Sequence, residues 1–129
     1  MKNSLILTNL SNLKNVDDDV VKLFIARVPF ANMAKYGVYH CTQIAPSSDL
    51  LSSTKAGKTS WESYVRRYRR EIAVSNDAQN MIDRIYKRLD FEKIALVCYC
   101  GDHHCHALIL GHYFEELGVN VVDGVVNRK

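Results

Sequence analysis

The stretch from residue 94 to residue 122 constrains the fold of this 129-residue chain more than any other part. The apolar run Ile94-Ala95-Leu96-Val97 predicts a buried strand that extends to Tyr99. Residues 107–117 predict a helix, with Gly118 as its C-cap, and residues 119–122 predict a further strand. A strand, a helix and a strand with short links form a βαβ unit, whose strands run parallel with a right-handed crossover.

Earlier parts of the chain predict three more strands, at residues 5–8, 22–26 and 38–41. The second should stop at 27–29, because Pro29 cannot donate to a sheet ladder. A short helical turn is expected at 17–21, and residues 30–48 otherwise resemble a loop.

Two long helices are predicted between these strands, after a short helix start at residues 46–51. In the helix at 60–74, helical spacing places Trp61, Val65, Tyr68 and Ile72 on one core face. Thr59 is expected to cap it, with Glu62 completing a capping box. A stripe from Met81 to Leu89 predicts the next helix, which is capped within 75–77.

Together these elements predict a small three-layer α/β domain, with a mostly parallel sheet flanked by helices and ending in the βαβ unit. We expect one domain over residues 1–129, because 47% apolar and 24% charged residues are ordinary for a globular chain. No secretory signal and no membrane-length apolar segment are evident. We therefore expect a cytoplasmic protein whose four cysteines are reduced.

The most reactive residues lie together at the predicted strand-to-helix turn, Cys98-Tyr99-Cys100-Gly101-Asp102-His103-His104-Cys105-His106. Ligands of open α/β sheets bind beyond the carboxyl ends of strands, and a helix start attracts anions. Cys105 should sit in the first helical turn among histidines, where the pKa of a thiol is lowered. Cys98, within the strand, is expected to be a small buried residue.

Three well-known sites of similar composition do not fit. A cysteine phosphatase needs an arginine six residues after its cysteine, and Gly111 stands six after Cys105. A Walker A loop ending at Gly57-Lys58-Thr59 would need a glycine at Ser52. Cys98 and Cys100 lack the Cys-x-x-Cys redox spacing.

A zinc site remains open as an alternative. Cysteine and histidine are zinc ligands, but four ligands from nine consecutive residues would force a cramped loop. His40 and Cys41 could supply a second ligand pair if the fold brings them near.

The charge pattern supports a second alternative. A net charge of +3 does not by itself indicate a nucleic-acid binder. The basic cluster Arg66-Arg67-Tyr68-Arg69-Arg70 could nevertheless contact phosphate backbones on a non-enzymatic accessory protein.

Several motifs occur in order along the chain: Ile25-Ala26-Arg27-Val28-Pro29, Ala45-Pro46-Ser47 with Leu50-Leu51, Gly57-Lys58, Trp61-Glu62-Ser63-Tyr64 with Arg67-Tyr68, Leu96-Val97-Cys98-Tyr99 and Cys105-His106. With them the whole chain resembles the domain of unknown function 488 family. The resemblance implies a compact α/β fold and a shared site, but no particular reaction. Two positions depart from the family pattern: Ala107 replaces a frequent arginine, and Cys100 a frequent acidic residue.

Neighbouring strand ends would bring Arg27, Tyr99 and Cys105 to one edge of the sheet. We expect Cys105, His106 and His104 to be the reactive residues, because histidine moves protons near neutral pH. The expected ligand-binding residues are Arg27, as the anion anchor, Tyr99, Asp102, Tyr64 and Arg67. The predicted ligand is an anionic small molecule, either a nucleotide or another phosphorylated metabolite, and no cofactor is predicted.

Overall fold

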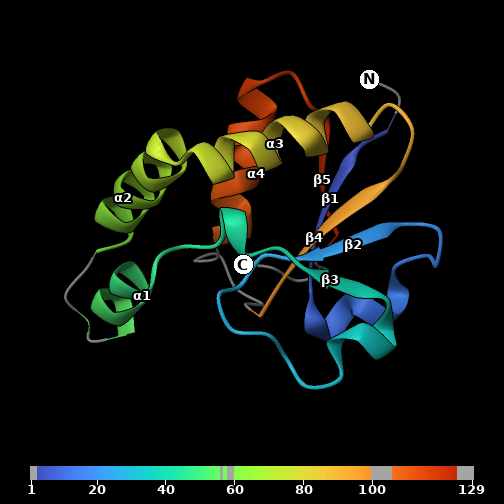
Figure 1. Ribbon diagram of the computed structural model, residues 1–129, viewed down its shortest axis with the longest axis horizontal. Coiled ribbons are helices and arrows are strands. Elements are labelled where there is room, and N and C mark those ends of the chain that lie inside the picture. Colours follow the sequence, from blue (N-terminus) through green and yellow to red (C-terminus); the bar gives the residue numbers. More distant parts are fainter. Residues whose placement is uncertain (1–2, 56, 58–59, 100–105, 125–129) are drawn as a thin grey trace.

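A five-stranded, wholly parallel sheet forms the centre of the described structure (Figure 1). The structure is a computed structural model that describes residues 3–55, 57, 60–99 and 106–124. The strand order is β3-β2-β4-β1-β5. The strands are β1 (Leu5–Asn9), β2 (Val21–Phe24), β3 (Val38–His40), β4 (Ile94–Cys98) and β5 (Val121–Asp123). The predicted α/β class with a parallel sheet is confirmed.

The middle strand, β4, explains why the sheet needs cover on both faces. All five of its residues are buried, and it pairs with β1 on one side and β2 on the other. Leu96 lies in register with Leu7 and with Leu23. A parallel strand that is apolar on both faces is stable only between two layers of other elements.

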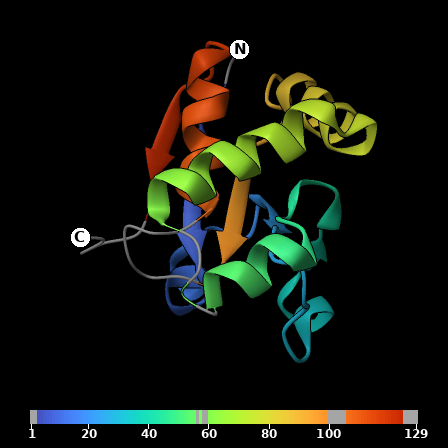
Figure 2. The ribbon, with the colours of Figure 1, turned by 90° about the vertical axis from the view of Figure 1, so that its left-hand side faces the viewer.

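The four α-helices of the described residues form the layer on one face of the sheet (Figures 1 and 2). Leu7, Leu96 and Cys98 from the sheet pack there against Ile72, Ile82, Leu110 and Phe114 from the helices. The helices are α1 (Ser48–Lys55), α2 (Trp61–Val74), α3 (Asn76–Arg88) and α4 (His106–Glu116).

Short 3₁₀ helices cover part of the opposite face. Phe24, Val38 and Val97 form a smaller core there, against Leu10 and Leu13 and against Phe30 and Met33. These 3₁₀ helices are η1 (Leu10–Asn15) and η2 (Met33–Tyr36), whereas η3 (Thr42–Ile44) lies on the side of the α-helices, where Ile44 belongs to the larger core. The predicted three layers are therefore present, with outer layers of unequal size.

The capping residues at the helix ends are those that the sequence predicts, with one exception. The Ser75 side chain accepts a hydrogen bond from the backbone N–H of Ala78, as a cap of α3 should. Gly118, at φ 92°, closes α4 in a Schellman motif, in which Val119 N–H donates to the carbonyl of Phe114. Thr59 is not the cap of α2: the N-cap is Ser60, which accepts from the N–H of Ser63.

Two other expectations about local structure also change. Residues 17–21 form a turn and the start of β2, and the helical turn lies earlier, in η1. Residues 30–48 contain η2 and η3 beside β3. The strands of the closing β4-α4-β5 unit are parallel, as expected, and β1 lies between them in the sheet. Within the described residues, no helix is both long and apolar enough to cross a membrane.

Candidate functional site

The carboxyl ends of β2 and β4 lie side by side in the sheet. Tyr99, which follows β4, donates a hydrogen bond from its hydroxyl to the carbonyl oxygen of Val28, at 3.1 Å. The Tyr99 ring packs edge-on against Phe24, the last residue of β2. The structure thus joins the segment after β4 to the segment after β2, as the parallel topology predicts.

His106 fixes the start of α4 to the same edge. Only 7% of its surface is exposed, and its Nε2 lies 2.8 Å from the carbonyl oxygen of Ile25. Because a carbonyl can only accept, Nε2 donates the hydrogen in this contact. The ring also meets Tyr68 edge-on, with centroids 5.8 Å apart.

Arg27 makes contacts that sequence reasoning missed. Its Nε donates to the carbonyl of Pro46 at 3.1 Å, and its Nη2 donates to the carbonyl of Ala45 at 3.3 Å. The guanidinium therefore holds the segment that enters α1. Beside it is a hollow of about 290 Å³ that Ser47 and Glu71 also line.

Helix α2 holds the same segment from the other side. The Tyr68 hydroxyl donates to the carbonyl of Ile44. Glu71 accepts from the backbone N–H of Ser47 at 2.9 Å and from the Ser47 hydroxyl. The Ser47 Oγ in turn accepts from the N–H of Leu50, which makes Ser47 the cap of α1. One signal could have pointed to Glu71: it lies three residues after Tyr68, on the same side of α2.

The aromatic residues of α2 form a series that leads to His106. Trp61 stacks on Tyr64, with centroids 5.4 Å apart and planes at 12°, and Tyr64 lies 6.1 Å from Tyr68. Tyr64 and Tyr68 are buried and Trp61 packs against the core, so the predicted core face is confirmed. A ligand-binding role for Tyr64 stays a prediction.

The described thiols at this edge are buried. Cys98 donates from Sγ to the carbonyl of Thr8, which confirms the expected buried role of Cys98. The Thr8 hydroxyl is itself buried and has no hydrogen-bond partner among the described residues. Burial raises the pKa of the Cys41 thiol to about 11, although hydrogen bonds from the Ile44 and Gln43 backbone act to lower it.

The central residues of the predicted site, Cys100 and Asp102 to Cys105, lie outside the described residues. The reactive roles of Cys105 and His104, ligand binding by Asp102 and the zinc alternative therefore stay predictions. His40, offered as a zinc ligand, places its Nε2 2.7 Å from the carbonyl of Ala26. In the part of the chain that the structure describes, no three His, Cys, Asp or Glu side chains form a group suited to a metal ion.

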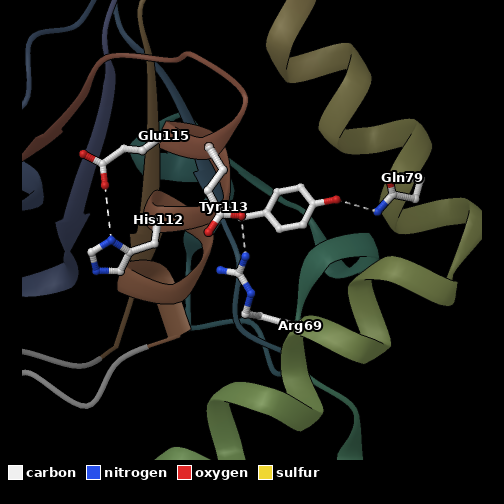
Figure 3. Close-up of polar contacts among 6 residues, drawn as sticks. Arg69, Gln79, His112, Tyr113 and Glu115 are labelled. Atoms are coloured by element: carbon white, nitrogen blue, oxygen red, sulfur yellow. Dashed lines mark hydrogen bonds and ion pairs between the residues drawn. The ribbon is translucent and has the colours of Figure 1, made fainter.

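The basic cluster of α2 has two parts. Arg66, Arg67 and Arg70 are exposed. Arg69 instead pairs with Glu116 of α4, and its guanidinium carbon lies 5.5 Å from the centre of the Tyr113 ring (Figure 3).

The same polar network continues into α3. The Tyr113 hydroxyl accepts from the Gln79 side chain at 3.1 Å, while His112 pairs with Glu115 on the exposed side of α4 (Figure 3). The contacts of Arg69 therefore help to join α2 to α4.

Comparison with known protein families gives a match to most of the chain. The family model DUF488-N3a, described as "Active DUF488-N3 subclade", matches residues 6–118. The matched region runs from β1 to the glycine that ends α4. Comparisons with the curated proteins and with the solved structures gave no significant match.

Proposed function

Because this chain belongs to the domain of unknown function 488 family, in a subclade described as active, we propose that it is an enzyme. Its substrate is a nucleotide or another phosphorylated metabolite, bound beyond the carboxyl ends of β2 and β4. Cys105 is the nucleophile. The observation that carries this proposal is the hydrogen bond between buried His106 and the Ile25 carbonyl, which fixes the start of α4 beside the end of β2.

The start of α4 suits an anionic substrate. The first backbone N–H groups of a helix have no partner within the helix, and they carry a partial positive charge. This charge attracts a phosphate and also stabilises a thiolate. Cys105 directly precedes His106, the first residue of α4, so its thiol is the nearest reactive group in sequence to that charge.

The proposed anion contacts need one revision. Arg27 uses its Nε and Nη2 on the carbonyls of Pro46 and Ala45. We therefore assign Arg27 to positioning the edge of the site. Arg67, exposed on α2, is proposed as a cation for the phosphate, and Ala107 supplies no charge.

The chemistry assigned to the site is nucleophilic substitution. The Cys105 thiol gives its proton to an imidazole, that of His104 or of His106. The thiolate then forms a bond to the electrophilic atom of the substrate. The leaving group departs with the electrons of the broken bond and takes the proton from the imidazolium.

Thiol alkylation followed by peptide mass spectrometry tests this proposal. The rate at Cys105 is measured against pH, with and without a panel of nucleotides and the matching nucleosides. We expect alkylation of Cys105 below pH 8, and we expect nucleotides to slow it more than nucleosides do. Cys41 is the internal control, because its raised pKa of about 11 and its burial keep it unreactive.

Two further results would decide against the proposal. A Cys105 that reacts no faster than Cys41, with no protection by any nucleotide, would make the turn structural. The zinc-stabilised alternative would be favoured if the protein binds one zinc ion per chain. That zinc should then be lost in Cys105→Ser and retained in Cys41→Ser. The variant Cys100→Ser shows whether the effects measured at the turn belong to Cys105 or to Cys100.

A second candidate function is nucleic-acid binding by α2. Arg66 and Arg70 are exposed and one helical turn apart, a spacing that can follow a phosphate backbone. Binding of this kind would weaken steeply with salt and would decrease in Arg66→Gln/Arg70→Gln. Unchanged affinity in that double variant would exclude it.

A further inference from the structure

Lys22 is a charged residue in an unusual place, because it lies within β2 and only 7% of its surface is exposed. Its Nζ donates to the carbonyl oxygens of Asp17 and Val20, both at 3.1 Å. An ammonium group has three hydrogens, so these carbonyls account for two of them. No carboxylate among the described residues forms an ion pair with Lys22. Burying a cation without a counter-charge is costly, and an anion beside it would relieve that cost.

A hollow of about 590 Å³ adjoins Lys22, on the sheet face opposite the α-helices. Two more lysines line it, Lys14 from η1 and Lys35 from η2, against a single carboxylate residue, Asp18. The lining thus carries two more positive than negative charges. Its volume falls within the range of small-molecule binding sites.

Two aromatic residues, Phe30 and Tyr36, also line the hollow, beside aliphatic side chains. Phe30 is held edge-on against Phe24, with ring centroids 5.0 Å apart. Tyr36 lies 6.2 Å from Phe30 and is 59% exposed. The left-handed backbone of Asn32 (φ 61°) and Gly37 (φ 69°) delimits η2, which carries Tyr36. An exposed ring beside a fixed one offers a planar ligand a surface for stacking.

We propose that this hollow is a second binding site, for a small planar metabolite that carries a phosphate, such as a nucleoside monophosphate. Lys22, with Lys14 and Lys35, binds the phosphate, and Phe30 and Tyr36 contact the ring. The site is separate from the one at the carboxyl edge of the sheet, and it needs neither Cys105 nor His106. The two sites are nevertheless close, because the Phe24 ring contacts both Phe30 and Tyr99.

Isothermal titration of the full chain tests the proposal with three probes: adenosine 5′-monophosphate, adenosine and ribose 5-phosphate. We expect the monophosphate to bind more tightly than either fragment, and less tightly at high salt. Equal affinity for adenosine would overturn the role of the lysines. Equal affinity for ribose 5-phosphate would overturn the role of the rings.

Variants then locate the binding. Lys35 and Tyr36 are exposed, so Lys35→Gln/Tyr36→Ala should fold and should lose about tenfold in affinity, which corresponds to about 1.4 kcal/mol. The matched control is Lys87→Gln, an exposed lysine on α3 paired with Asp83, which should bind normally. Lys22→Met should also lose binding while keeping the fold, because it removes a buried charge that has no counter-charge.

The two proposed sites can fail separately. Titrating Cys105→Ser should leave this binding unchanged. Monophosphate binding that is the same in Lys35→Gln/Tyr36→Ala as in the unmodified chain would overturn the second site. That result would leave the alkylation test of Cys105 unaffected.

Discussion

The imidazole Nε2 of His106 lies 2.8 Å from the carbonyl oxygen of Ile25, so the first residue of α4 is tied to the residue that follows β2. The two residues are 81 positions apart in the sequence. Both are buried, and a hydrogen bond in a buried environment is costly to leave unmade. The edge of the sheet on which the proposed function depends is therefore fixed before any ligand arrives.

Replacing His106 by phenylalanine tests this contact. The Phe ring can keep the packing against Tyr68, but the carbonyl of Ile25 loses its donor. We expect the free energy of unfolding in urea to fall by about 1–3 kcal/mol. The control is His112→Phe on the exposed side of α4, which should change stability by about 0.5 kcal/mol or less. Equal effects of the two substitutions would contradict this assignment.

Thr8→Val should stabilise the protein. The Thr8 hydroxyl is buried and has no hydrogen-bond partner in the described structure, so it loses its hydration on folding without compensation. Valine keeps the shape and removes the hydroxyl, and we expect a gain of about 1–2 kcal/mol in thermal or urea unfolding. Thr8→Ser, which keeps the hydroxyl and removes a methyl group, should be less stable than the unmodified chain. A loss of stability in Thr8→Val would mean that the hydroxyl has a partner in solution.

Ser47 and Glu71 should behave as one unit. Ser47→Ala removes both the cap of α1 and a donor to Glu71, and it should cost about 1–2 kcal/mol. Because Glu71→Gln disturbs the same contact, the double variant should be more stable than the sum of the two single losses predicts. A double-mutant cycle in urea should give a coupling energy of about 1 kcal/mol. Additive losses would show that the two side chains act independently.

Alkaline pH should lower stability through Cys41. The thiol of the unfolded chain ionises near pH 9.0, whereas burial raises the pKa of the folded thiol to about 11. Between these values the unfolded state holds fewer protons, so the free energy of unfolding falls as the pH rises, and this contribution stops above about 11. The total loss is on the order of 2–3 kcal/mol. Urea unfolding at several pH values measures it.

Cys41→Ala provides the reference for that measurement, because tyrosines and lysines also titrate at alkaline pH. The difference in stability between the two proteins should shrink from pH 8 to pH 11. A constant difference would mean that the buried thiol ionises as easily in the folded chain as in the unfolded one.

The elements that were predicted best are those whose structure depends on residues close together in the sequence. The run from Ile94 to Val97 is apolar at every position, as a strand covered on both faces must be. Ser75 and Gly118 mark the ends of α3 and α4 because capping depends on residues only a few positions apart. The 3₁₀ helices η1 and η2 were missed because such short helices leave no clear periodicity.

The candidate site was predictable only to the extent that it follows from topology. Parallel strands place their carboxyl ends together, so the proximity of Tyr99 to the segment after β2 could be expected. The partners of Arg27 could not, because they are backbone carbonyls whose positions depend on the path of residues 45–46. Nor does any pattern mark Lys22 as buried, since a lysine within a strand ordinarily faces solvent.

The position of β4 has a consequence for how the protein is made. This strand lies between β1 and β2, both of which belong to the first 24 residues, yet it is itself completed only at Cys98. Until then a growing chain can pair β2 with β3, but β1 and β2 have no strand to join them. Unpaired strand edges favour association with other chains, and pairings distant in sequence form slowly. Translation must therefore pass residue 98 before the sheet can close, which makes the nascent chain the stage at which this fold is most exposed to aggregation.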